Sequence, residues 1–463
     1  MKNKTRINLK NNFKVKFDGL PNLKLDEVSS SGIIGVSPLN YNFLKAKVIV
    51  NIGDTVKQGQ ALFFDKKNPQ VYFHSPISGI IKDIEYGPQR RLDLIKIEQN
   101  NKPAIKFSDL TLNKTSNIEF KSALLERGLW NGLIELPFYN IPSPDKIPPA
   151  IIIPLSHSEP FQPKLSTIID NYEQDIINGI EWLKKLSPNI SVFVDADEKI
   201  NLDNISEHIK ITRVNGDFAS TSAGAFLYHM KSSAEENKAW ICNWQHLVKI
   251  SKTLSSNQYY NKALICLGGN QKKDNQHYLV QEGVALNDVF KLKNKKDRVI
   301  CGGLFTGLHI ENPSYLPLGI YAINVIDNDP KTEFLAFMQI GLEKPSFSRA
   351  YLSGVIGEAT ARLKDIPLPQ FSELEYLTKT STAVNGSDRD CVSCGFCEIV
   401  CPVDSLPQTL LRNAKVDDIE ENMRLGLLDC SGCGACTYVC PSKIDLASTF
   451  INMKNNLYKE LNA

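Results

Sequence analysis

Apolar and polar positions follow different periods in different parts of the chain. From residue 51 to 97, short apolar stretches are separated by turn residues, as at Gly53-Asp54 and Ser78-Gly79, which is typical of a β-rich module. From residue 120 to 262, segments with helical spacing alternate with short apolar runs. We expect helices over 123–130, 167–186 and 240–254, and strands over 150–155 and 190–194. This order favours an α/β layer with a mainly parallel sheet.

The β-rich stretch looks like the barrel-sandwich hybrid of lipoyl and biotinyl domains. Lys66 and Lys67 lie between its two turn-rich segments, but in Phe-Asp-Lys-Lys-Asn-Pro rather than in a Met-Lys-Met or Asp-Lys-Ala turn. A structural β-module is therefore favoured over a covalent cofactor carrier. Residues 262–325 carry further strands and glycine turns and predict a small β-rich domain, followed by a linker to residue 362.

Composition and charge describe an ordinary globular chain. Its 463 residues are 42% hydrophobic, and 53 basic against 51 acidic side chains give a net charge of +2, so overall charge does not favour a nucleic-acid partner. No apolar run approaches the roughly 20 residues that span a bilayer, and we expect a cytoplasmic protein. Residues 2–16 carry six basic and no acidic side chains. A solvated tail is favoured there, with contact to anionic lipid or an acidic partner as the alternative.

The cysteines carry the most specific signal. Cys242, Cys266 and Cys301 are isolated in apolar surroundings and are expected to be structural. The other eight of the eleven form two copies of the pattern C-x2-C-x2-C-x3-C-P. The first run is Cys391, Cys394, Cys397 and Cys401, and the second is Cys430, Cys433, Cys436 and Cys440.

This spacing is typical of bacterial ferredoxins with two 4Fe-4S clusters, in which the fourth cysteine of each run ligates the other cluster. One cluster is therefore predicted at Cys391, Cys394, Cys397 and Cys440, and the other at Cys430, Cys433, Cys436 and Cys401. Structural zinc and disulfides are the alternatives. Zinc gives no reason for two identical four-cysteine runs, and a cytosolic chain rarely keeps disulfides, so we favour iron–sulfur clusters.

The 28 residues between the two runs, 402–429, have apolar positions at helical spacing. They predict a helical two-cluster module rather than a compact β-hairpin ferredoxin. We expect one helix from near Leu406, capped by Asp404 or Ser405, a second from near Asp417, and a final helix after Pro441. Clusters in such a module would lie close enough to exchange single electrons.

Several stretches, taken in order, resemble the A subunit of the Na+-translocating NADH:quinone reductase (Nqr). They are Lys67-Asn68-Pro69 through Ser75-Pro76-Ile77-Ser78-Gly79, Gly87-Pro88-Gln89-Arg90-Arg91, Leu124-Leu125-Glu126-Arg127-Gly128-Leu129-Trp130, Pro137-Phe138, Arg298-Val299-Ile300-Cys301-Gly302-Gly303, and Ser348-Arg349-Ala350-Tyr351-Leu352-Ser353. The cysteine-rich tail departs from that subunit. It resembles the C subunit of the related Rnf complex, through Leu406-Pro407 and Tyr438-Val439-Cys440-Pro441-Ser442.

Both relatives share ancestry with the NADH-binding, flavin-bearing subunit of respiratory complex I. The resemblance implies four parts: an N-terminal segment with a barrel-sandwich hybrid in residues 1–110, a Rossmann-like α/β domain in 111–261, a β-grasp-like domain in 262–345, and a helical tail with two 4Fe-4S motifs in 346–463. Contact with FMN or quinone is implied by resemblance alone. His157, after the strand at 150–155, is a candidate flavin or nucleotide contact, with a solvated loop histidine as the alternative.

Nucleotide-binding signatures are incomplete. No G-x-G-x-x-G follows a predicted strand, and the glycine-rich flavin and NADH loops of Rnf are missing. The Nqr relative commonly has Gly-Pro-x-Pro-x-Gly followed by Thr-His-Ile-His, of which only Gly216 and His229 remain. Direct oxidation of NADH by this chain is therefore not favoured.

The leading hypothesis is a peripheral subunit on the cytoplasmic side of a membrane NADH:quinone oxidoreductase of the sodium-pumping type. It would relay electrons through two 4Fe-4S clusters, with membrane subunits of an Nqr- or Rnf-type complex as partners. One alternative is an Rnf-type C subunit that itself oxidises NADH through FMN and feeds the clusters. The other is a docking scaffold whose clusters are structural.

Overall fold

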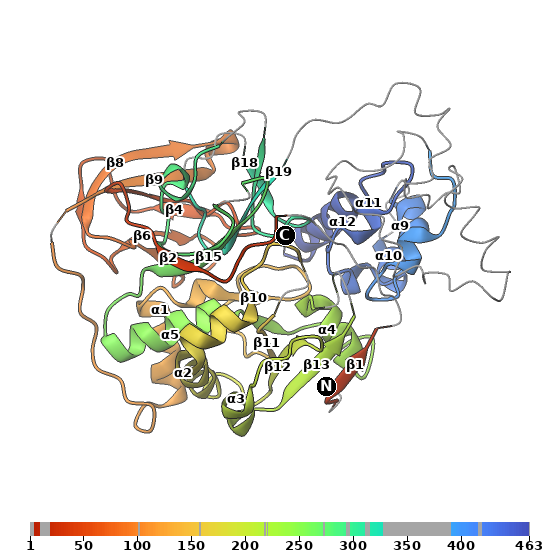
Figure 1. Ribbon diagram of the computed structural model, residues 1–463, viewed down its shortest axis with the longest axis horizontal. Helices are drawn as coiled ribbons and strands as arrows, with labels where there is room; N and C mark the ends of the chain where they lie inside the picture. Colours follow the sequence, from red (N-terminus) through yellow and green to blue (C-terminus); the bar gives the residue numbers. More distant parts are fainter. Residues whose placement is uncertain are drawn as a thin grey trace.

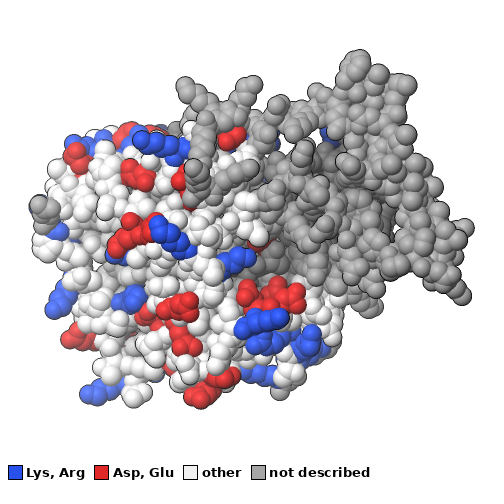
Figure 2. Space-filling model, viewed as in Figure 1, with Lys and Arg blue, Asp and Glu red and all other residues white. Residues whose placement is uncertain are grey.

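A computed structural model describes residues 4–9, 19–100, 102–156, 159–216, 219, 221–271, 274–292, 297–310, 315–326, 390–414 and 419–462. Figure 1 shows two β-rich parts above an α/β layer, with a helical carboxy-terminal module beside them. Lys and Arg are interspersed with Asp and Glu over the face seen in Figure 2, as the small net charge leads one to expect. Among the described residues, no helix is long and apolar enough to cross a bilayer.

The barrel-sandwich part consists of two small sheets that face each other across a shared apolar core. The first sheet contains, in order, β3 (Ile33–Val36), β9 (Leu92–Gln99), β8 (Gly79–Tyr86) and β5 (Thr55–Val56), and the second β4 (Ala46–Val48), β6 (Ala61–Asp65) and β7 (Tyr72–His74). Val56, Leu62 and Phe73 are fully buried in this core. Alternating inward and outward side chains therefore explain the period read from the sequence.

The α/β layer is built on a six-stranded sheet. In order, its strands are β1 (Arg6–Asn8), β13 (Ile211–Asn215), β12 (Ile190–Asp195), β11 (Ile151–Pro154), β14 (Trp240–Cys242) and β10 (Leu133–Glu135). All neighbours are parallel except β14 and β10, which are antiparallel. The expected mainly parallel sheet is confirmed.

Helices cover both faces of this sheet. Ile151 and Ile153 pack with α2 (Leu165–Leu183) and α5 (Trp244–Ser256), whereas Ile152 points to the opposite face and packs with α4 (Ala223–Met230). Because successive side chains of a strand alternate between faces, a wholly apolar strand needs a cover on each side. The short helix α3 (Asp203–His208) follows β12 and contacts α2.

Two helix predictions need correction. The helix expected over 240–254 is a strand followed by a helix, because residues 240–242 pair with β10 and β11 and Asn243 caps α5 by accepting from the His246 backbone N–H. The helix expected over 123–130 is α1 (Asn117–Glu126), which begins earlier. Ser116 and Glu119 form a capping box there, and this polar start carries no apolar period.

The third sheet is mixed. Its strands, in order, are β18 (Leu308–Ile310), β17 (Arg298–Cys301), β19 (Ala322–Ile326), β15 (Lys262–Gly269), β16 (His277–Gln281) and β2 (Leu25–Glu27), and the short helix α6 (Leu286–Val289) follows β16. The segment before residue 30 therefore adds β1 to the α/β sheet and β2 to this one. A solvated tail is wrong for residues 6–8, because Ile7 is 3% exposed and packs in the α/β core.

The carboxy-terminal module is helical, as expected. It contains α8 (Phe396–Ile399), α9 (Pro407–Asn413), α10 (Ile419–Arg424), the 3-10 turn η5 (Leu427–Asp429), α11 (Ala435–Tyr438) and α12 (Leu446–Leu461). Leu410, Leu427, Leu446 and Phe450 form its small core. Neither Asp404 nor Ser405 caps α9: Leu406 holds the N-cap position, and Pro407 begins the helix with its preset φ. Asp417 and the linker expected up to residue 362 lie outside the described residues.

Candidate functional site

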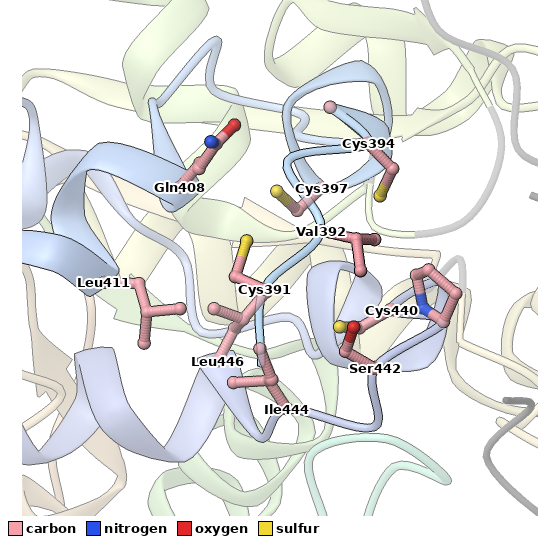
Figure 3. A pocket seen from close by; sticks show the side chains of 12 residues that line it. Cys391, Val392, Cys394, Cys397, Gln408, Leu411, Cys440, Ser442, Ile444 and Leu446 are labelled. Atoms are coloured by element: carbon pink, nitrogen blue, oxygen red, sulfur yellow. The ribbon is translucent and has the colours of Figure 1, made fainter. Parts of the chain in front are cut away.

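Four cysteines line one hollow of the carboxy-terminal module. They are Cys391, Cys394, Cys397 and Cys440, the set predicted for the first cluster. Figure 3 shows their sulfur atoms around a common space, with Leu411, Ile444 and Leu446 on the neighbouring wall. The fourth thiol comes from the second cysteine run, so the two runs meet at this hollow.

The other four cysteines line a second hollow. Cys430, Cys433 and Cys436 come from the second run, and Cys401 comes from the first. Pro402, Ala435 and Phe450 supply apolar walls. Each hollow therefore receives three thiols from one run and one from the other, which is the exchange that the spacing predicts.

The two runs have the same backbone conformation at corresponding positions. Gly395 and Gly434 have φ of 76° and 80° and precede the short helices α8 and α11. Ser393 (φ 53°) corresponds to Gly432 (φ 67°), and Asp404 (φ 46°) to Lys443 (φ 53°). Side chains at the last two positions tolerate a conformation that glycine adopts without strain, so the repeat extends beyond the cysteines to the backbone that wraps each hollow.

The donor set of each hollow fits an iron–sulfur cluster. Only thiols could ligate a soft metal there, and they surround a space rather than converge on a point. Over the described ranges, no three His, Cys, Asp or Glu side chains come together as ligands of a single ion. Burial raises the pKa of Cys397 to about 12 and that of Cys401 to about 11. These thiols are therefore protonated without metal, and metal binding would release their protons.

The hollows differ in their surroundings. Cys391 is exposed, and its neighbour Val392 is 47% exposed. The second hollow instead faces the body: Cys433 borders an apolar cluster that joins Val439 and Tyr438 to Phe161 and Phe305. Phe305, from the loop after β17, meets the ring of Tyr438 edge-on at 5.2 Å between centroids. One hollow thus lies at an open edge and the other against the rest of the molecule.

Polar contacts hold the second run against the α/β layer. The Tyr139 hydroxyl donates to the Ser431 carbonyl at 3.2 Å, and Lys231 pairs with Asp429 at 2.5 Å. Lys454 on α12 donates from Nζ to the Cys430 carbonyl at 2.9 Å. Burial lowers the pKa of Lys454 to about 8, although the neighbouring thiol groups and Asp429 oppose the shift.

Other residues singled out in the sequence are placed as follows. The Lys67 ammonium lies 4.7 Å from the ring centre of Tyr458 on α12, so the β6–β7 turn contacts the last helix. His229 Nε2 lies 2.8 Å from the Pro402 carbonyl oxygen, directly after Cys401. Cys242, Cys266 and Cys301 are buried in strands, as expected. His157 lies outside the described residues.

Sequence reasoning missed Tyr139, Lys231 and Lys454. Each acts through a tertiary contact with the second cysteine run, and no local spacing announces such a contact. One signal was available for Lys454: it follows Phe450 by one helical turn on the apolar face of a predicted helix.

The fold and the two thiol-lined hollows define a multidomain α/β protein with a ferredoxin-like carboxy-terminal module. Three family descriptions match: the NqrA N-terminal barrel-sandwich hybrid domain over residues 7–100, the NqrA second alpha/beta domain over 115–259, and a 4Fe-4S dicluster domain over 390–444. The chain is NqrA-like, and the expected resemblance to that component of Nqr is confirmed. The resemblance of the tail to the Rnf C subunit stays a prediction.

Curated relatives support this assignment over most of the chain. The A subunit of the Na(+)-translocating NADH-quinone reductase of Mannheimia succiniciproducens is 27% identical over 431 residues, 91% of this chain and 92% of the relative. The protein of the same name from Haemophilus influenzae Rd is 28% identical over 431 residues, with the same coverage. Among solved structures, an NAD+-reducing NiFe-hydrogenase in the air-oxidized state matches with a TM-score of 0.31 and 12% identity, covering 68% of this chain and 60% of that chain. That likeness carries no argument.

Proposed function

We propose that this chain is a peripheral electron-transfer subunit of a membrane NADH:quinone oxidoreductase of the sodium-translocating type, on the cytoplasmic side. The observation that carries the proposal is the exchange of cysteines between the two hollows. One 4Fe-4S cluster would be held by Cys391, Cys394, Cys397 and Cys440, and the other by Cys430, Cys433, Cys436 and Cys401. The names of the relatives supply the reaction and the membrane partners.

The clusters, when bound, supply one-electron transfer. The chain's own residues hold them and control their surroundings. Leu446 and Phe450, on successive turns of α12, line the first and the second hollow respectively, so one helix keeps both hollows apolar. Because Cys391 lies at an open edge, a redox partner would reach the first cluster there, while the second cluster faces the body.

Metal analysis tests the proposal directly. The complex is purified anaerobically, and iron and acid-labile sulfide are measured per copy of this chain. We expect about eight of each. Zinc in place of iron, or iron without sulfide, contradicts the two-cluster relay.

Stepwise reduction followed by EPR separates the candidate roles. If NADH reduces the clusters only in the whole complex, and dithionite alone reduces them in the isolated chain, the chain is a relay. Reduction of the isolated chain by NADH, with FMN in the preparation, favours the Rnf-type entry subunit. Full turnover after Cys394→Ser and Cys433→Ser, in a complex that still assembles, favours the docking scaffold.

A further inference from the structure

Lys454 places a buried ammonium group beside the second hollow. The residue is 6% exposed, and its Nζ donates to the Cys430 carbonyl at 2.9 Å. Nζ also lies 5.6 Å from the ring centre of Tyr139, whose hydroxyl donates to the carbonyl of Ser431. The lysine therefore contacts the first ligand of the second run at the seam between the module and the α/β layer.

This charge has no carboxylate partner within the described part of the chain. No Asp or Glu oxygen there lies within 4.0 Å of Nζ. Asp429 lines the same cavity but is paired with Lys231 at 2.5 Å. A buried charge without a counter-ion costs several kcal/mol, and one hydrogen bond to a neutral carbonyl offsets only part of that cost.

A cluster at the second hollow would supply the missing negative charge. Four thiolates outweigh the positive charge of the iron–sulfide core, and each added electron makes the group more anionic. The wall of the first hollow contains no charged side chain apart from the cysteines, and its polar members Gln408 and Ser442 are neutral. The two hollows therefore differ in electrostatics although their backbones repeat.

We propose that Lys454 is the counter-charge of the cluster held by Cys430, Cys433, Cys436 and Cys401, and that its positive charge raises the reduction potential of that cluster alone. This inference rests on the proposed function, because it requires the cluster. A fixed positive charge favours the reduced, more negative state. Lys454 is thus a positioning residue that sets where an electron rests in the module.

The test is an EPR-monitored redox titration of the purified complex carrying Lys454→Met, Lys454→Gln or Lys454→Arg. Gln keeps a donor for the Cys430 carbonyl but removes the charge, so it separates charge from hydrogen bonding. Lys459→Met is the matched control, because Lys459 lies on the same helix and is exposed. The second cluster is identified as the signal that Cys433→Ser removes.

In the Met and Gln variants we expect the ratio of reduced to oxidised second cluster, at the wild-type midpoint, to fall at least tenfold, which is about 59 mV for one electron. The first cluster, the Arg variant and the Lys459 control should keep their potentials. If Met and Gln lose half of the iron and Arg keeps it, the need for a positive charge is supported as well.

Unchanged potentials in the Met and Gln variants, with both clusters present, overturn the role of Lys454 and leave the two-cluster relay standing. Loss of the second cluster in all three variants, Arg included, also overturns it, because the residue would then be structural. Iron analysis of the wild-type complex comes first; absence of clusters there removes the proposed function and this inference together.

Discussion

Phe43 of the barrel-sandwich part stacks on Tyr458 of the last helix, with ring centroids 4.0 Å apart and ring planes at 25°. Phe138 meets the same tyrosine edge-on at 5.2 Å, and the Lys67 ammonium lies over its ring. One tyrosine near the end of the chain is thus clasped by residues from the β-module and from the loop after β10. This contact anchors α12, which lines both cysteine hollows.

Tyr458→Ala should therefore loosen the carboxy-terminal module. Loss of a half-buried ring and its aromatic and cation–π contacts should destabilise the docked module by about 2 kcal/mol. The expected result is faster proteolysis within the module and a lower midpoint for loss of cluster absorbance in urea.

The neighbouring substitution Lys459→Ala is the control for this effect. Lys459 is exposed on the same helix, so its removal should leave both measurements within error. Equal proteolysis of the two variants would mean that the aromatic clasp does not anchor the module.

The exchange of the fourth cysteines has its own test. Cys401→Ser should disturb the EPR signal of the cluster at Cys430, Cys433 and Cys436, and Cys440→Ser that of the cluster at Cys391, Cys394 and Cys397. Each substitution should cost up to about four iron atoms per chain. Cys301→Ser, a buried thiol in β17, should leave both signals intact. Disturbance of the cluster of the same run would instead mean that each run holds its own cluster.

Local signals predicted much of this architecture. The strand Ile151–Pro154 and the helix Leu165–Leu183 could be read from the sequence because their burial is continuous or strictly periodic. The grouping of the eight cysteines could be read because ligand spacing is fixed by the shape of a cluster.

What failed depended on partners distant in sequence. Trp240–Cys242 is a strand because β10 and β11 offer it hydrogen bonds on both sides, although its apolar run continues smoothly into a helix. Ile7 is buried because β13 lies beside it, more than 200 residues later. A basic segment with few apolar residues gives no local sign of such pairing.

Lys443 offers a test of the backbone around the first hollow. It has a φ of 53° and an exposed side chain directly after the fourth cysteine turn. Lys443→Gly should stabilise the module by up to about 1 kcal/mol, because glycine relieves the left-handed conformation. Lys443→Asn should fall between the two, and Lys443→Val should destabilise. Urea midpoints for cluster loss give the order, and the reverse order for Gly and Val would rule out left-handed strain at this position.

Acid sensitivity of the body should come from two buried histidines. Burial lowers the pKa of His74 to about 4 and that of His246 to about 3, and Lys249 adds to both shifts. In the unfolded chain a histidine titrates near 6.5, so between about pH 6.5 and pH 4 the unfolded state binds more protons. The free energy of unfolding therefore falls as the pH is lowered through this window, by about 2 kcal/mol per histidine at pH 5.

The measurement is a series of urea unfolding curves of the chain between pH 7.5 and pH 5, followed by tryptophan fluorescence. His74→Gln and His246→Gln should each lower stability at pH 7.5 but flatten its dependence on pH, because the group that titrates is gone. His309, exposed on β18, supplies the control, and His309→Gln should keep the wild-type slope. A slope that survives in the double variant His74→Gln, His246→Gln would assign the acid sensitivity to other groups.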